Sequence, residues 1–209
     1  MDLHYSKRKP DWLLADRTSW NPWQRLAHRT RGIITPGNIA SISGLVLVCV
    51  GAAQVIQDNS LWGLSMIALG RMLDLADGFL AHHTGTKSRL GEAVDSVADK
   101  LASLVVFVVF AIAEIMMLWQ LIPLFLLQLG NVVATVIARV RCLTIHTSKT
   151  GKIATLLQWI AIGLYAVAFL VKDQTTIVTG LAHVVLIVTL LYGVSATLGY
   201  YKKALQKPN

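Results

Sequence analysis

The amino-acid sequence predicts an all-α membrane protein with six transmembrane helices, preceded by an amphipathic segment that lies at the membrane surface. Hydrophobic residues make up 55% of the 209 residues and charged residues only 14%, whereas soluble domains average about 25% charged residues. Six apolar runs after Pro36 approach the roughly 20 residues that a membrane-spanning helix needs. These runs cover residues 38–56, 61–81, 92–113, 118–140, 153–171 and 177–199.

The distribution of positive charge predicts how these helices are oriented. The formal net charge is +8, and on a membrane chain such an excess indicates attraction to anionic lipid and cytoplasmic loops rather than a nucleic-acid partner. If the N-terminus is cytoplasmic, nearly all Lys and Arg residues fall on that side, and Lys172 alone falls on the other. We therefore expect both termini and the loops after the second and fourth helices to be cytoplasmic, in a bacterial inner membrane.

The N-terminal residues 1–33 mix tryptophans with arginines and lack the apolar core and cleavage site of a signal peptide. Tryptophan rings favour the headgroup layer and arginines favour lipid phosphates, so we expect an interfacial segment. A disordered basic arm is the alternative. The predicted organisation is this cytoplasmic or interfacial segment, a transmembrane domain over 34–201 and a cytoplasmic tail over 202–209.

Four aspartates gather where the second predicted helix ends and the third begins. Asp74 and Asp77 are three residues apart and Asp95 and Asp99 four apart, so each pair projects from one face of its helix. The short connection makes the two helices antiparallel neighbours that aim both pairs at one point. An aspartate at the centre of a membrane helix costs about 2.5–3.5 kcal/mol, so the cluster requires compensation.

Oxygen ligands without soft ligands favour Mg²⁺ or Mn²⁺ over zinc as the compensating ion. Two such ions about 3.5–4 Å apart form the clamp used for displacement at phosphorus. The alternative is that Asp95 and Asp99 stabilise a helix N-terminus while Asp74 and Asp77 lie in a solvated turn. Arg71, one turn before Asp74, is expected to pair with Asp74 or Asp95, or to contact a substrate phosphate.

Small residues accompany the aspartates. Gly78 and Ala81 leave the aspartate face of their helix almost without side chains, and Gly91 does the same at the start of the next helix. This leaves room for a nucleotide base or ribose, although close packing of helices through small residues is the alternative interpretation.

The segment resembles the CDP-alcohol phosphatidyltransferase family, whose motif is D-x2-D-G-x2-A-R-x8-G-x3-D-x3-D. His82 stands where the family usually has arginine, and at neutral pH a histidine often lacks that charge. The Thr35-Pro36-Gly37-Asn38 segment is also similar to the family's beginning. The residues that match the motif at every spacing are Asp74, Asp77, Gly78, Ala81, Gly91, Asp95 and Asp99.

The resemblance implies an enzyme that transfers a phosphatidyl group from CDP-diacylglycerol to a hydroxyl acceptor and releases CMP. It also implies that the protein is a homodimer and that it contacts membrane lipid. In the family's reaction, Asp99 would be the general base that takes the proton of the acceptor hydroxyl. Two Mg²⁺ or Mn²⁺ ions would be held by Asp74, Asp77, Asp95 and Asp99. The CDP-lipid would lie against Asp74, Gly78, Ala81, His82, Gly91 and Asn38.

A second basic cluster flanks the loop after the fourth helix and consists of Arg139, Arg141, Lys149 and Lys152. Arginine forks and lysine charges suit a phosphate on the acceptor, whereas ordinary positive-inside anchoring is the alternative. The pattern Gly151-Lys152-x2-Thr155-x2-Gln158 resembles phosphatidylglycerophosphate synthases and the related cardiolipin synthases. Glycerol 3-phosphate is therefore the expected acceptor, with phosphatidylglycerol and inositol phosphate as alternatives.

Two other classes of function are open to a six-helix bundle with clustered aspartates. A cation transporter would use them as an ion site, but transporter sites lie at the membrane midplane on broken helices, and these aspartates lie beside a loop at one face. A homologue that binds substrate without turning it over is the second alternative, and His82 is the residue that favours it.

Overall fold

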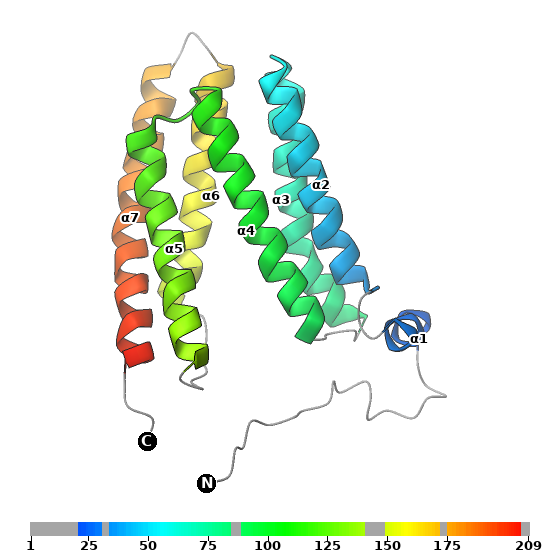
Figure 1. Ribbon diagram of the computed structural model, residues 1–209. Helices are drawn as coiled ribbons and strands as arrows, with labels where there is room; N and C mark the ends of the chain where they lie inside the picture. The colour runs from blue at the N-terminus through cyan, green and yellow to red at the C-terminus, as the bar shows by residue number, and fades with distance from the viewer. Residues whose placement is uncertain (1–20, 31–33, 85–88, 141–148, 172–174, 206–209) are drawn as a thin grey trace. The chain divides into compact units, whose positions relative to one another are not determined.

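The computed structural model describes residues 21–30, 34–84, 89–140, 149–171 and 175–205 (Figure 1). These residues form seven α-helices and divide into two compact units, Met1–Val106 and Phe107–Asn209, each of which is described by itself. The helices are α1 (Pro22–Arg29), α2 (Pro36–Ile56), α3 (Ser60–His83), α4 (Arg89–Ile112), α5 (Leu118–Val140), α6 (Lys149–Leu170) and α7 (Thr175–Leu205).

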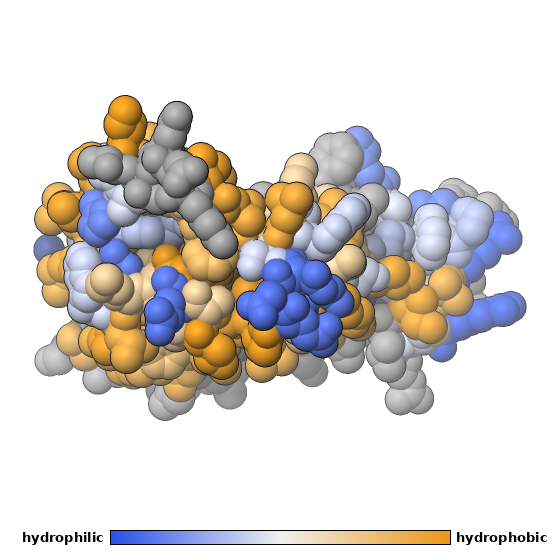
Figure 2. Space-filling view, turned by 90° about the horizontal axis from the view of Figure 1, so that it is seen from above, coloured by the Kyte–Doolittle hydropathy of each residue, from blue (hydrophilic) through white to orange (hydrophobic). Residues whose placement is uncertain are grey.

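The six predicted apolar runs correspond to α2 through α7, and α7 continues six residues beyond the predicted end at 199. Within the described residues, three helical segments are long and apolar enough to cross a membrane: Pro36–Ile56, Thr150–Leu170 and Ile177–Lys202. Figure 2 shows many hydrophobic residues at the surface, and Trp62 and Ile177 leave 70% and 84% of their surfaces exposed. Helices that are apolar on all sides are typical of an integral membrane protein. The all-α membrane class is confirmed, and the number of six spans stays a prediction.

Two helices begin at proline-containing caps that satisfy otherwise unpaired backbone amides. Thr35 precedes α2, and its hydroxyl accepts a hydrogen bond of 3.1 Å from the amide of Asn38. Asn21 precedes α1 and forms a reciprocal capping box with Gln24, with bonds of 2.8 and 3.0 Å. The described part of the predicted interfacial segment therefore contains a short helix with the basic residues Arg25, His28 and Arg29, and residues 1–20 and 31–33 lie outside the described residues.

Four glycines bring α2 and α3 into close contact. Gly44 and Gly51 on α2 face Gly70 and Gly63 on α3, and a β-carbon added to any of the four would lie 2.6–2.7 Å from the carbonyl oxygen of its partner glycine. Lipid chains are as apolar as leucine, so membrane helices associate through small residues that let backbones approach. The glycines therefore fix α3, which carries Asp74, against α2.

In the second unit, α7 packs against both α5 and α6, and a buried polar network joins all three helices. The side-chain amide of Gln120 donates to the hydroxyl of Tyr165 and to Nε2 of His183, both at 3.1 Å. Nδ1 of His183 lies 2.7 Å from the carbonyl of Thr179, so it carries the proton. His183 thus has a structural role, because it connects α7 to Gln120 of α5.

Substitution of Gly63 by alanine tests the glycine contact. We expect G63A to lower the free energy of unfolding by about 1–3 kcal/mol, because its β-carbon would lie 2.6 Å from the Gly51 carbonyl oxygen and from Val55. Gly163 on α6 provides the matched control, since a β-carbon there meets nothing within 4 Å. G163A should be neutral or stabilise by about 0.5–1 kcal/mol through helix propensity. Equal unfolding midpoints for the two variants in detergent would contradict the close contact.

Candidate active site

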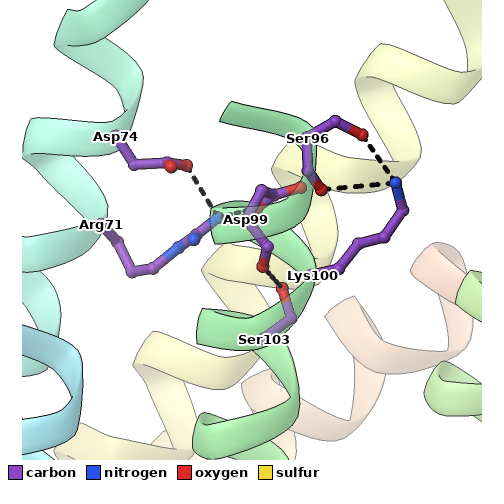
Figure 3. Close-up of polar contacts among 6 residues, drawn as sticks. All are labelled: Arg71, Asp74, Ser96, Asp99, Lys100 and Ser103. Carbon is purple, nitrogen blue, oxygen red and sulfur yellow. Dashed lines mark hydrogen bonds and ion pairs between the residues drawn. The ribbon is translucent and has the colours of Figure 1, made fainter. Parts of the chain in front are cut away.

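Arg71 joins the two helices that carry the predicted aspartates. Its Nη2 atom lies 3.2 Å from Oδ2 of Asp74, one turn further along α3, and 2.6 Å from Oδ1 of Asp99 on α4. Figure 3 shows the guanidinium between the two carboxylates. The structure therefore brings an aspartate of the first pair and an aspartate of the second to one point, as the spacing predicted. The predicted partner Asp74 is confirmed, and Asp99 is a partner that the sequence analysis did not name.

The three charged groups differ in their exposure to solvent. The side chains of Arg71 and Asp74 are each 13% exposed, whereas that of Asp99 is 45% exposed. An ion pair with little access to water is screened much less than a surface pair, and removal of one partner leaves an uncompensated charge. Among the described side chains, the guanidinium of Arg71 thus offsets the desolvation of Asp74, and Asp99 is the more accessible of the two carboxylates.

The residues that follow Asp99 along α4 have different partners. Lys100 turns away from Arg71 and donates to the hydroxyl and the carbonyl of Ser96 at 2.7 and 3.3 Å (Figure 3). Ser103 donates to the backbone carbonyl of Asp99 at 2.8 Å. The Asp99 carboxylate therefore interacts with a cation from the other helix, while the lysine next to it in sequence is held by its own helix.

Helix α1 is attached to the same end of α3 as the aspartates. The side-chain Nδ2 of Asn21 donates a hydrogen bond of 3.0 Å to the carbonyl of Thr84, which directly follows α3. The same asparagine caps α1 through its oxygen atom, so one side chain connects the short basic helix to the end of α3. This contact was not predicted from the sequence, although the Asn-Pro-x-Gln pattern is typical of a capped helix start.

The other predicted site residues are described to different extents. Asn38 is buried in the first turn of α2, and Gly91 and Asp95 are half-buried near the start of α4. Lys152 is exposed on α6. Arg141 lies outside the described residues. Several others lie in described helices, but their side chains are outside the described part: Asp77, Gly78, Ala81 and His82 in α3, Arg139 in α5 and Lys149 in α6.

The described side chains do not by themselves contain three or more His, Cys, Asp or Glu residues grouped as a metal site. The side chain of Asp77, one of the four predicted ligands, lies outside the described part of the chain. The donor set nevertheless suits a hard divalent ion, because Asp74 and Asp99 offer carboxylate oxygens and a positively charged nitrogen already lies between them. The position between the two carboxylates already holds a positive group, so these residues are suited to a metal cation.

Comparison with known proteins shows the family of the chain. Residues 33–194 match the family described as CDP-alcohol phosphatidyltransferase. The chain belongs to the CDP-alcohol phosphatidyltransferase family. Like other members, it is a transferase, and the family is generally metal-dependent. No solved structure matches the chain.

Three curated relatives illustrate the range of activities in the CDP-alcohol phosphatidyltransferase family. A CDP-diacylglycerol–glycerol-3-phosphate 3-phosphatidyltransferase of Aquifex aeolicus is 29% identical, and the match covers 74% of this chain and 86% of that enzyme. An archaetidylinositol phosphate synthase of Pyrococcus horikoshii is 28% identical over 66% of this chain and 77% of its own length. A CMP-forming cardiolipin synthase of Rattus norvegicus is 29% identical over 50% of this chain and 32% of its length.

Proposed function

We propose that the protein transfers a phosphatidyl group from CDP-diacylglycerol to glycerol 3-phosphate, with release of CMP. The observation that carries this proposal is the convergence of Asp74 and Asp99 on one guanidinium, inside a motif whose spacing matches that of a transferase family. Divalent ions held by these carboxylates would supply the positive charge that the diphosphate of a CDP-lipid needs.

In the proposed reaction, the acceptor hydroxyl oxygen attacks the lipid-side phosphorus of the diphosphate. A phosphorus–oxygen bond to the acceptor forms, the bond to CMP breaks, and CMP leaves with the electron pair. Asp99 takes the proton of the hydroxyl, a role that suits the more exposed carboxylate because the acceptor must reach it. Asp74, Asp77, Asp95 and Asp99 would hold two Mg²⁺ or Mn²⁺ ions, and these ions would supply positive charge that stabilises the negative charge developing on the diphosphate.

Glycerol 3-phosphate is supported by similarity and by charge. The match to the Aquifex enzyme covers more of both chains than the matches to the cardiolipin synthase and the archaetidylinositol phosphate synthase. The basic cluster of Arg139, Arg141, Lys149 and Lys152 would bind the acceptor's phosphate. Phosphatidylglycerol and inositol phosphate are the alternative acceptors, since relatives named for both kinds of product match this chain.

We place the site at the cytoplasmic face of the membrane, because the positive-inside rule assigns the ends of the helices that carry it to that side. CDP-diacylglycerol would enter from the lipid, with its nucleotide against Asp74, Gly78, Ala81, His82, Gly91 and Asn38. Two copies of the chain would form a homodimer.

Substitution of Asp99 by asparagine tests its role as the base. Asparagine keeps an oxygen that can accept a hydrogen bond from Arg71 but cannot take a proton, so we expect kcat to fall about 10²–10⁴-fold with CDP-diacylglycerol binding largely retained. CMP release and equilibrium binding are the two measurements. D58N is the control, because Asp58 is an exposed turn residue with φ of 64°, a conformation that asparagine also adopts. Equal losses of turnover and binding in D99N would contradict this division of roles.

The acceptor can be identified by incubating the purified protein with CDP-diacylglycerol, Mg²⁺ and each of the three candidate acceptors separately. We expect CMP and phosphatidylglycerol phosphate with glycerol 3-phosphate, as detected by mass spectrometry of the lipids. A product with only phosphatidylglycerol or inositol phosphate would overturn the choice of acceptor and leave the reaction class intact. Absence of CMP with all three would overturn the reaction class.

Substitution of His82 by arginine restores the residue usual in the family motif. If this position contacts the diphosphate, the added charge should lower KM for CDP-diacylglycerol about tenfold with little change in kcat, since charge-assisted hydrogen bonds contribute about 1.5–3 kcal/mol. H83R is the matched control, because exposed His83 adds the same charge about 100° around the helix. The same KM in both variants would show that position 82 does not contact the lipid diphosphate.

A further inference from the structure

We infer that Arg71 is a resident counter-cation of the aspartate site, which holds Asp99 to Asp74 while no metal is bound and withdraws when a divalent ion takes its place. This inference rests on the proposed function, because it takes the carboxylates to be metal ligands. Arg71 lies three residues before the first motif residue, so the motif itself assigns it no role.

The distances around Arg71 favour such an exchange. One nitrogen atom, Nη2, lies 3.2 Å from the Asp74 carboxylate and 2.6 Å from the Asp99 carboxylate. Mg²⁺ binds carboxylate oxygens at about 2.0–2.1 Å, so an ion that bridges these two residues needs the space that Nη2 fills. A guanidinium and a divalent ion this close together would also repel each other, and the low exposure of Arg71 and Asp74 limits the screening of that repulsion by water.

Burial explains why the arginine stays when no ion is present. Its side chain is 13% exposed, as is that of Asp74, and a charge so far removed from water is costly without an opposite charge beside it. The pairing with Asp99 also holds α4 toward α3, since it joins residues 28 positions apart in the chain. Arg71 thus keeps the site assembled, and it does so by competing with the metal.

This competition predicts two effects of opposite sign for Arg71→Gln. Without metal, the carboxylates lose their counter-charge and repel each other, so the variant should unfold at a lower temperature than the wild type. With metal, no cation has to leave, so the variant should reach half of its metal-induced stabilisation at a lower ion concentration, by a factor of at least about three. An arginine that only supports the fold would produce the first effect without the second.

The experiment measures the unfolding midpoint of the full chain in detergent as MnCl₂ is added, starting from metal-free protein and without substrate. Lys100→Gln is the matched control, because it removes one positive charge directly beside Asp99 in sequence. The Lys100 amine donates instead to the hydroxyl and carbonyl of Ser96. We expect K100Q to follow the wild type in both midpoint and half-saturating Mn²⁺ concentration.

The half-saturating Mn²⁺ concentrations of R71Q, K100Q and the wild type decide between competition and its alternatives. A half-saturating Mn²⁺ concentration in R71Q that equals or exceeds the wild-type value overturns the inference and leaves the metal site standing. An equal decrease in K100Q also overturns it, because general electrostatics would then explain the effect. A wild-type protein that Mn²⁺ does not stabilise overturns the proposed metal site and this inference with it.

If R71Q does not fold without metal, Arg71→Lys tests the same competition between the side chain and the ion. Lysine retains the charge but offers a single ammonium in place of the guanidinium fork. Its half-saturating Mn²⁺ concentration should therefore fall, and by less than threefold. A higher Mn²⁺ requirement in R71K than in the wild type would contradict competition between the side chain and the ion.

Discussion

Charge compensation between α3 and α4 is the interaction on which the site depends. A carboxylate on an apolar helix that is largely removed from water needs an opposite charge, and the guanidinium of Arg71 supplies one to Asp74 while it also contacts the more exposed Asp99. The same contact links two helices that are separate in sequence. Assembly of the site and neutralisation of its charge are therefore one event in this protein.

The described helices associate in three physically different ways. In the first unit, α2 and α3 approach through glycines whose backbones nearly touch. In the second, Gln120, Tyr165 and His183 connect α5, α6 and α7 through hydrogen bonds. Both suit a medium in which apolar side chains gain little from leaving lipid. The described contact between Arg71 and Asp99 is of a third, electrostatic kind, because it joins opposite charges on α3 and α4.

The sequence predicted the apolar helices well because length and hydropathy are local properties. It placed the end of α7 too early, since Tyr200, Tyr201 and Lys202 end the apolar run although the backbone continues as a helix to Leu205. The spacing of the aspartates predicted that they converge, and Asp74 and Asp99 do. The contact of Arg71 with Asp99 depends on how α4 is rotated about its axis relative to α3. The network around Gln120 likewise joins single residues from three helices, so neither could be predicted from local patterns.

The glycine contacts also fix the axial position of α3 relative to α2. Gly44 and Gly51 are seven residues apart on α2, and Gly63 and Gly70 are seven apart on α3, so the pairs match in one alignment. Sliding α3 by one turn, about 5.4 Å, would set a glycine against a residue such as Val48 or Ile67 and force side chains into backbone. Asp74, whose amide lies 3.6 Å from the position of a Gly44 β-carbon, is thereby held at a constant depth along α2. Displacement of Asp74 along the axis of α2 would therefore break the glycine contacts.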